Sequence, residues 1–470
     1  MQVNEKEIII FILKKSMKYI LINIFFICLN ISFAQQQDSL FIKKLYQTSL
    51  TQGHSYENLR ELCKNIGARL SGSSEAEMAI LWSKLKMENY HFDTVYLQEI
   101  KVPHWERGTK ETAWWQTDKQ KNPQKLHILA LGGSIASDGL LSGEIVVFNH
   151  LDELKKADQS KVKNKIVLLN QAMDPTFINT FSSYGACAGI RFSGAMEAAK
   201  LGAKGILIRS LGLPQDQHPH TGMMAYNDSI QKIPAAALST EDCNRLATLA
   251  SKEKVTVHFE LDCKTLPDIT SYNVIAEIRG KKAKEIITLG GHLDSWDAGE
   301  GAHDDGAGVI HCLEALRLLK SMNYQPQHTL RVVFFMNEEN GNMGGKTYAT
   351  WAKSRGEKHI AALESDRGGF APRGFSCDGS ASHIDWLKSI APQFKAYELH
   401  DFEKGYGGVD INPLKKEFPE IALFGFVPDS QRYFDLHHTE MDVFETVNKR
   451  ELELGCAAIA SFVYLIDRNF

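Results

Sequence analysis

Apolar residues recur along the chain with two different periods, which predict helices in some segments and strands in others. Residues 38–92 carry them at helical spacing, as at Leu59, Leu62 and Ile66, so we expect helices there. Residues 93–102 alternate between apolar and polar positions, as a half-buried strand does. The first part of the chain is therefore predicted to be mainly helical and to end in a strand.

The pattern changes at about residue 120. Between 120 and 264 the apolar residues form short runs, as at 145–148, 165–169 and 205–208, and one helix is predicted at 192–202. Short apolar runs of this kind are typical of strands that are buried on both faces. We expect a separate, smaller α/β unit here, inserted into the rest of the chain.

From residue 272 onward strand, loop and helix alternate, which is the order that a doubly wound sheet requires. The predicted fold is therefore α/β, with a mixed, mainly parallel, doubly wound sheet that is flanked by helices. Its strands are predicted at 286–289, 330–336, 360–363 and 421–426, and its helices at 306–320 and 451–466. The predicted limits are 1–34 for a leader, 35–119 and 265–470 for the sheet domain, and 120–264 for the insertion.

The leader predicts export of the protein. Lysines up to Lys18 precede an apolar run over 19–31, which ends in Ser32-Phe33-Ala34 before a polar segment. This is the pattern of a secretory signal peptide with a cleavage site at small residues, and the run is short for a membrane-spanning helix. An uncleaved anchor is the alternative. We expect a secreted or periplasmic protein with no stable membrane span once residues 1–34 are removed.

Composition narrows the classes of function. The 470 residues are 43% hydrophobic, enough for a large core, and the net charge of −4 comes without a basic run, so we expect no nucleic-acid partner. The eight cysteines contain no C-x-x-C pair, which argues against a thiolate metal site or a disulfide framework. We expect buried, mostly free cysteines, although Cys243 and Cys263 are close enough in sequence to be bridged.

Acidic residues and histidines follow the predicted strands with a strong bias. Ligands of open α/β sheets bind beyond the carboxyl ends of the strands, so these side chains are expected to meet at one edge of the sheet. Each alone has a structural explanation, as a helix cap or a solvated loop residue. Together they form the set that two zinc-type ions need, namely a bridging carboxylate and a histidine plus a carboxylate for each ion. The candidates are His292, Asp294, Asp304, Asp305, Glu338, Glu339, Asp366, His437 and His438.

Five stretches that contain these residues resemble, in the same order, the co-catalytic zinc aminopeptidase and glutamate carboxypeptidase family. They are GGHLDSWD at 290–297, GAHDDGAG at 301–308, NEENG at 337–341, ESD at 364–366 and HTEMD at 438–442. Further similar stretches, among them RLSGS at 69–73 and PHTG at 219–222, extend the resemblance over nearly the whole chain. The insertion resembles a protease-associated domain, which would cover the active site as a lid.

The resemblance implies a role for each matching residue. Asp304 would bridge two zinc ions, with His292 and Asp366 holding one ion and Glu339 and His438 holding the other. His438 is preferred over its neighbour His437 because the family's histidine is followed by a small hydroxyl residue and by an aspartate four positions on.

Further roles concern catalysis and substrate. Glu338 would be the general base, and Asp294 would accept the second ring N–H of His292 and so fix its tautomer. Arg367 is expected either to meet a substrate carboxylate or to form an ion pair. Asp410 could bind a free amino terminus, and His220 could contact substrate from the lid.

The expected function is that of a secreted zinc-dependent exopeptidase that acts on short peptides, dipeptides with free termini first among them. An aminopeptidase that acts on longer peptides is the alternative. The one-zinc glutaminyl cyclases and non-catalytic, receptor-like relatives are further rivals, and the complete set of ligands argues against both. A homodimer is compatible with the resemblance, because members of the family often form dimers.

Overall fold

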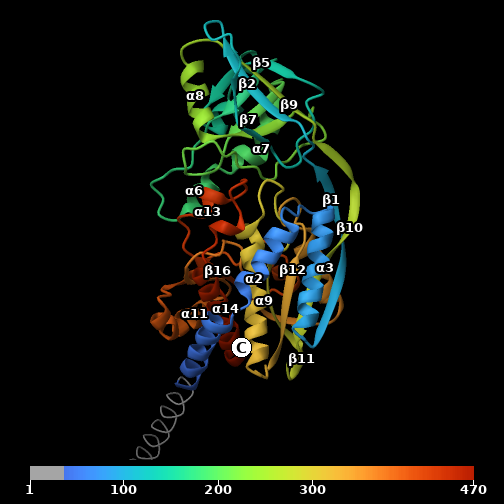
Figure 1. Ribbon diagram of the computed structural model, residues 1–470, viewed down its shortest axis with the longest axis vertical. Helices are drawn as coiled ribbons and strands as arrows, with labels where there is room; N and C mark the ends of the chain where they lie inside the picture. The colour runs from blue at the N-terminus through green and yellow to red at the C-terminus, as the bar shows by residue number, and fades with distance from the viewer. Residues whose placement is uncertain (1–35) are drawn as a thin grey trace, which may run out of the picture.

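The computed structural model describes residues 36–470. The predicted signal peptide and Cys28 lie outside the described residues. Two sheets follow one another along the long axis of the molecule, with the larger sheet below and the smaller one above (Figure 1). We call the smaller sheet with its helices, residues 111–261, the inserted unit.

The larger sheet is mixed, and its middle strands are parallel. The pairs β12–β11, β11–β13 and β13–β16 are parallel, whereas antiparallel pairs lie toward both edges. This confirms the predicted α/β class with a mixed sheet. In sheet order the strands are β1 (Thr94–Glu106), β10 (Lys264–Ile278), β12 (His328–Phe335), β11 (Lys282–His292), β13 (Lys358–Glu364), β16 (Ala422–Pro428), β14 (Pro372–Asp378) and β15 (Asp401–Lys404).

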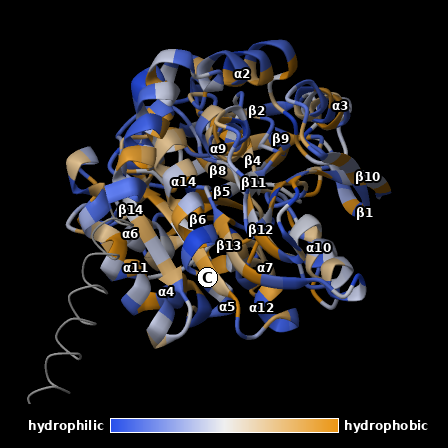
Figure 2. Ribbon diagram, turned by 90° about the horizontal axis from the view of Figure 1, so that it is seen from below, coloured by the Kyte–Doolittle hydropathy of each residue, from blue (hydrophilic) through white to orange (hydrophobic). Residues whose placement is uncertain are grey.

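Helices cover both faces of this sheet because its strands are apolar on both sides. In β12, Leu330, Val332 and Phe334 belong to one buried cluster, and Val333 and Phe335 belong to another on the opposite face. The first cluster includes residues of 36–52, which is helical, and of α2 (Ser55–Glu61), α3 (Ser74–Asn89), α9 (Ala307–Ser321), α11 (Ala381–Phe394) and α14 (Lys449–Asn469). The second includes residues of α10 (Met343–Ser354) and α12 (Leu414–Glu417). Figure 2 shows the apolar central strands inside a ring of helices with polar outer faces.

The inserted unit has its own sheet and its own core. Buried residues of α7, β6 and β7 pack on one face, and residues of β9 and α8 pack on the other. Its strands, in sheet order, are β3 (Gln124–Lys125), β2 (Glu111–Thr117), β9 (Val255–Leu261), β5 (Leu141–Phe148), β6 (Ile166–Leu169), β7 (Gly205–Arg209), β8 (Ala235–Leu238) and β4 (Ile128–Ala130). Its helices are α4 (Leu151–Lys155), α5 (Gln159–Val162), α6 (Thr180–Cys187), α7 (Gly189–Lys200) and α8 (Thr240–Ala250).

The chain enters the inserted unit through β1 and returns through β10. These long strands pair with each other along their whole length, from Thr94 opposite Glu277 to Glu106 opposite Lys264. The strand β2 pairs within the smaller sheet, although the sequence pattern placed its residues ahead of the insertion. The limit at residue 120 stays a prediction, and the sheet pairing supports one about nine residues earlier.

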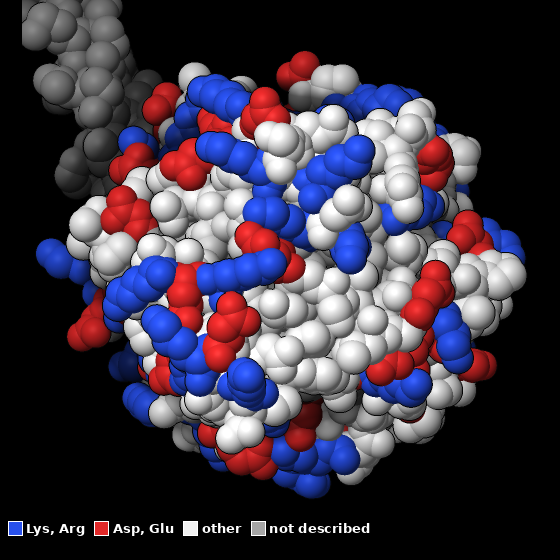
Figure 3. Space-filling model, turned by 90° about the horizontal axis from the view of Figure 1, so that it is seen from above, with Lys and Arg blue, Asp and Glu red and all other residues white. Residues whose placement is uncertain are grey.

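Other sequence expectations can be compared directly with the structure. The helices predicted at 192–202, 306–320 and 451–466 correspond to α7, α9 and α14. Within residues 36–470 the seven cysteines are free and buried, so Cys243 and Cys263 are not bridged. No helix of the described part of the chain is long and apolar enough to cross a membrane. Basic and acidic side chains are interspersed over the outer face of the inserted unit (Figure 3).

A buried ion pair joins β12 and β10 of the larger sheet to Glu357, the residue that precedes β13. Arg331 on β12 donates to both carboxylate oxygens of Glu357, at 2.7 and 2.9 Å, and its Nε donates to Glu277 on β10 at 2.8 Å. The Arg331 side chain is only 2% exposed. Burial raises the pKa of Glu357, but the hydrogen bonds from Arg331 outweigh this effect and hold that pKa well below its ordinary value of 4.5.

We therefore predict that Glu357→Gln lowers the free energy of unfolding by about 3 kcal/mol at pH 7, because it leaves a buried cation with one partner fewer. A carboxylate with a lowered pKa in the folded state stabilises the fold above its unfolded pKa, and this stabilisation is lost as the pH falls. Urea unfolding should therefore show the gap between wild type and variant closing below pH 4.5. Glu403→Gln, in the exposed pair with Lys388, is the matched control and should cost under about 1 kcal/mol. A gap of the same size at low pH would contradict this account.

Candidate metal centre

The predicted site residues converge at the carboxyl ends of the parallel strands. His292 ends β11, Glu338 and Glu339 follow β12, and Asp366 follows β13. Asp304 lies in the turn at Ala302–Gly306 that leads into α9, and His438 follows the short helix α13 (Tyr433–Leu436). The topology of the sheet therefore brings together residues that are up to 146 positions apart, from His292 to His438.

Two histidine rings face carboxylates that share Asp304. The Nε2 atom of His292 lies 3.2 Å from Asp304 Oδ1 and 3.3 Å from Asp366 Oδ1. The Nε2 atom of His438 lies 3.2 Å from Asp304 Oδ2 and 3.1 Å from Glu339 Oε2. Each oxygen of Asp304 thus belongs to a different group of three side chains.

The second nitrogen of each ring fixes its tautomer. Nδ1 of His292 is 2.9 Å from the main-chain carbonyl oxygen of Asp294, and Nδ1 of His438 is 3.1 Å from that of Thr221. A carbonyl oxygen can only accept a hydrogen bond, so both Nδ1 atoms carry the proton. In the neutral rings each Nε2 then directs a lone pair at two carboxylate oxygens. Acceptors that face acceptors at this distance need a cation between them, either a proton or a metal ion.

The pKa values of the cluster reflect this crowding of acids. Burial raises the pKa of Glu338 well above its ordinary value, and the nearby Asp366 and Glu339 raise it further. Burial alone would lower the pKa of His438, but the carboxylates of Glu339 and Asp304 raise it to about 9. The site therefore attracts positive charge strongly.

Asp294 acts differently from the sequence expectation. Its carboxylate oxygens are at least 4.0 Å from Nδ1 of His292, so the predicted hydrogen bond to the ring is made by the main-chain carbonyl of Asp294 instead. The carboxylate accepts main-chain N–H groups of Asn337, Glu338 and Glu339, at 2.7, 3.2 and 3.3 Å. Asp294 thus positions the turn that carries two other site residues.

Two further buried carboxylates hold the Asp304 turn. Asp442 accepts the main-chain N–H groups of His303 and Asp304, at 2.7 and 3.1 Å. Asp305 accepts those of His292 and Gly308, both at 3.0 Å. The sequence pattern suggested a helix cap for Asp305, and the bond to Gly308 on α9 agrees with that reading.

His437 and His438 stack on each other, with ring centroids 3.5 Å apart. Nε2 of His437 lies 3.5 Å from Asp304 Oδ2, so both rings come close to the shared carboxylate. Of the two, His438 has the closer approach to Asp304 and also approaches Glu339. Both rings have a nitrogen atom close enough to Asp304 for the three residues to hold a metal ion, so the choice of His438 over His437 stays a prediction.

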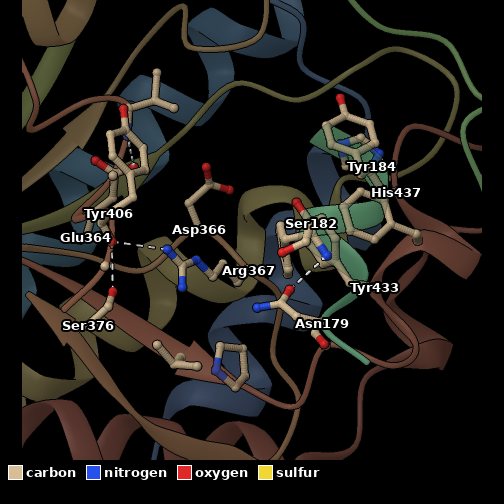
Figure 4. Close-up of a pocket in the computed structure, with 18 of the residues that line it drawn as sticks. Asn179, Ser182, Tyr184, Glu364, Asp366, Arg367, Ser376, Tyr406, Tyr433 and His437 are labelled. Atoms are coloured by element: carbon tan, nitrogen blue, oxygen red, sulfur yellow. Dashed lines mark hydrogen bonds between the residues drawn. The ribbon is translucent and has the colours of Figure 1, made fainter. Parts of the chain in front are cut away.

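A cavity of about 1100 Å³ opens onto these residues and lies between the larger sheet and the inserted unit. Asp304, Glu338, Glu339, Asp366 and His438 line it. Figure 4 shows Glu364, Asp366, Arg367 and Tyr406 on one side, and Asn179, Ser182, Tyr184 and His437 on the other. The sequence pattern did not single out Asn179, Ser182 or Tyr184 of the inserted unit, because polar residues at the start of a helix carry no distinctive motif.

Of the three predicted substrate contacts, only Arg367 lines the cavity. Arg367 lines the cavity, and its guanidinium donates to the carbonyl of Tyr406 at 3.2 Å and lies over the ring of Phe181. Asp410 and His220 are 0% and 2% exposed, and neither is part of the cavity wall. Their assignment as substrate contacts stays a prediction for which the structure offers no accessible surface.

A mixed α/β sheet with imidazoles and carboxylates gathered at its strand ends is typical of metal-dependent hydrolases. Residues 273–463 match the pattern of peptidase family M28. The chain is 33% identical over 419 residues to carboxypeptidase Q of Mus musculus, covering 88% of this chain and 86% of that protein. It therefore belongs to peptidase family M28, and it is a hydrolase of the metallopeptidase class.

Solved structures agree with this assignment. The peptidase M28 precursor from Shewanella amazonensis SB2B superposes with a TM-score of 0.87 at 33% identity, covering 92% of this chain and 97% of that one. A zinc aminopeptidase from Bacillus subtilis shares the fold, with a TM-score of 0.63 at 20% identity over 88% of this chain and 94% of that one.

The role of Asp294 generates a prediction. Asp294→Ala leaves three buried N–H groups without their acceptor and should lower the free energy of unfolding by about 3 kcal/mol. Asp294→Asn keeps one carbonyl oxygen, which can retain the bonds to Asn337 and Glu338, and should cost about half as much. Denaturant unfolding of both metal-free variants measures this difference. Equal, small costs for the two variants would show that the carboxylate does not hold the turn.

Proposed function

We propose that this protein is a secreted exopeptidase that hydrolyses short peptides, dipeptides with free termini first among them, with two zinc ions and with Glu338 as general base. The observation that carries the proposal is the pair of histidine lone pairs, each directed at two carboxylate oxygens, with Asp304 shared between them. Export rests on the pattern of residues 1–34, which lie outside the described part of the chain.

The donor set and its spacing fit zinc. Ligand atoms on a tetrahedral zinc ion at about 2.0–2.1 Å lie about 3.3 Å from one another. The four distances between His Nε2 and carboxylate oxygen, 3.1–3.3 Å, agree with this value. In addition, Oε1 of Glu339 and Oδ1 of Asp366 are buried without a hydrogen-bond partner among the described residues. His292 and Asp366 would hold one ion, Glu339 and His438 the other, and Asp304 both.

Two bound zinc ions would act as Lewis acids toward a water molecule and toward the scissile carbonyl group. Glu338 is placed to do the remaining proton chemistry. Its carboxyl group is half-buried and lines the cavity, whereas the neighbouring Glu339 is directed at His438. Because it faces the cavity beside the proposed ligands, Glu338 would take a proton from the attacking water and return it to the leaving amine.

The cavity supports a short substrate with a free carboxylate. Its volume, about 1100 Å³, is of the size that encloses small ligands. Arg367 follows Asp366 directly and lines the cavity, and one hydrogen bond to Tyr406 leaves most of its donors available. We propose that the Arg367 guanidinium binds the free carboxylate of the peptide.

A one-zinc glutaminyl cyclase is the rival activity on a related fold. The presence of both groups of three side chains, rather than one, favours the two-ion peptidase. An aminopeptidase that acts on longer peptides remains the alternative within the same chemistry, and it is distinguished by which terminus the enzyme requires.

The test is hydrolysis of a dipeptide panel by zinc-loaded protein, with the amino or the carboxyl terminus blocked in matched analogues. We predict that unblocked dipeptides are cleaved and that blocking the carboxylate abolishes cleavage. Glu338→Gln should retain its zinc and lose about 10³-fold or more in kcat, because the general base is lost. The matched control is Glu88→Gln, an exposed acid on α3 that pairs with Lys84, is not part of the cavity wall and should leave kcat unchanged. A Glu338→Gln enzyme with near-normal kcat would rule out this residue as the base.

A further inference from the structure

The inserted unit contacts the proposed zinc ligand His438 through two main-chain hydrogen bonds. The carbonyl of Thr221 accepts the Nδ1–H of the His438 ring at 3.1 Å, and the N–H of Thr221 donates to the main-chain carbonyl of His438 at 3.0 Å. One residue of the inserted unit therefore fixes both the tautomer and the backbone of His438.

Thr221 is anchored in the inserted unit. Its hydroxyl donates to the carbonyl of Ala130, the last residue of β4, at 2.7 Å. The next residue, Gly222, accepts a hydrogen bond from the N–H of Gly132 at 3.0 Å. The guanidinium of Arg191 on α7 also donates to the Thr221 carbonyl, at 3.4 Å. The position of this carbonyl thus depends on how the inserted unit docks.

The backbone of His438 needs such support. Its φ angle is +63°, in the left-handed region that is unfavourable for a residue other than glycine. A conformation of this kind persists where surrounding contacts hold it in place. The bond from Thr221 N–H to the His438 carbonyl is one such contact, and it comes from outside the larger sheet.

The other histidine has no such dependence. Nδ1 of His292 is held by the carbonyl of Asp294, two residues away on the same loop, and the N–H of His292 is held by Asp305. The two halves of the proposed metal centre therefore differ in which part of the chain supports their histidine. The His292 side is supported entirely within the unit of the larger sheet, and the His438 side is completed by the inserted unit.

We propose that the main chain of Thr221 positions His438, so that docking of the inserted unit and zinc binding on the His438 side stabilise each other. This inference rests on the proposed function, because it takes His438 as a zinc ligand. Coupling between two equilibria is reciprocal. A loosened Thr221 loop must therefore weaken the binding of zinc on the His438 side, and bound zinc must in turn hold the Thr221 loop in place. The ion on the His292 side would be affected only through the shared Asp304, because the supports of the His292 ring come from Asp294 and Asp305.

Gly222→Ala is the variant that tests the coupling. Gly222 has a φ angle of +135°, which residues with a side chain rarely adopt, so an alanine there favours rotation of the peptide that carries the Thr221 carbonyl. Its Cβ atom would also lie 2.5 Å from the flexible end of the Arg191 side chain, which would have to move. Gly139→Ala is the matched control, because it introduces similar backbone strain in the inserted unit, at φ +93°, with nothing within 4 Å of the new Cβ. Circular dichroism checks that both variants are folded.

Two readouts use the full chain without its leader. Competition with a chromophoric chelator measures both zinc affinities, and hydrogen exchange measures the protection of the Thr221 amide with and without zinc. We predict that Gly222→Ala weakens one of the two affinities by about tenfold or more, the usual cost of losing a partner of a metal-bound histidine, and changes the other much less. Gly139→Ala should change neither. In the wild type, zinc should slow exchange at the Thr221 amide.

The outcomes separate this inference from the proposed function. Wild-type protein that binds no zinc would overturn both. Wild-type protein that binds two zinc ions without slower exchange at the Thr221 amide would overturn the coupling alone. The coupling would also be overturned if the Thr221 loop of Gly222→Ala exchanges faster while both zinc affinities stay unchanged. Equal losses of zinc affinity in Gly222→Ala and Gly139→Ala would overturn it as well.

Discussion

The site is governed by one electrostatic constraint: buried hydrogen-bond acceptors, namely histidine nitrogens and carboxylate oxygens, face one another. Two imidazole lone pairs face the carboxylates of Asp304, Asp366 and Glu339 at 3.1–3.3 Å, and among residues 36–470 no side-chain donor stands between them. Such an arrangement is unfavourable unless cations occupy the space between the acceptors. The surrounding structure holds the two rings in place by main-chain carbonyls, which do not titrate and have little freedom to move.

This support explains several features that packing alone does not require. The carboxylates of Asp294 and Asp442 accept hydrogen bonds from main-chain N–H groups of two turns. These turns carry Glu338, Glu339 and Asp304. Asn337, which directly precedes the two glutamates, has a positive φ angle of +77°, as His438 has. Backbone strain thus lies beside the residues whose orientation matters, and buried hydrogen bonds balance it.

Much of the fold and of the site could be predicted from the sequence, because both depend on local patterns. The nearly continuous apolar run at 330–336, interrupted by Arg331, indicated a strand covered on both faces, and β12 is one. The site residues could be found because the carboxyl ends of parallel strands must meet. The contribution of Thr221 could not be predicted, since a main-chain carbonyl leaves no mark in the sequence. For the same reason the carboxylate of Asp294 was expected to hold the ring of His292, whereas its carbonyl does so. The strand β15 at one edge of the larger sheet and its neighbour β14 were missed because they lack a clear apolar period.

The central claim is that Asp304 bridges two zinc ions, and metal stoichiometry after equilibrium dialysis tests it most directly. Wild-type protein should retain two zinc ions per chain. His292→Ala should retain one, because the ligands on the His438 side remain, and Asp304→Ala should retain neither firmly, because it removes a ligand from both. A wild type that holds one ion or none, or an Asp304→Ala variant that still holds two, would contradict the account.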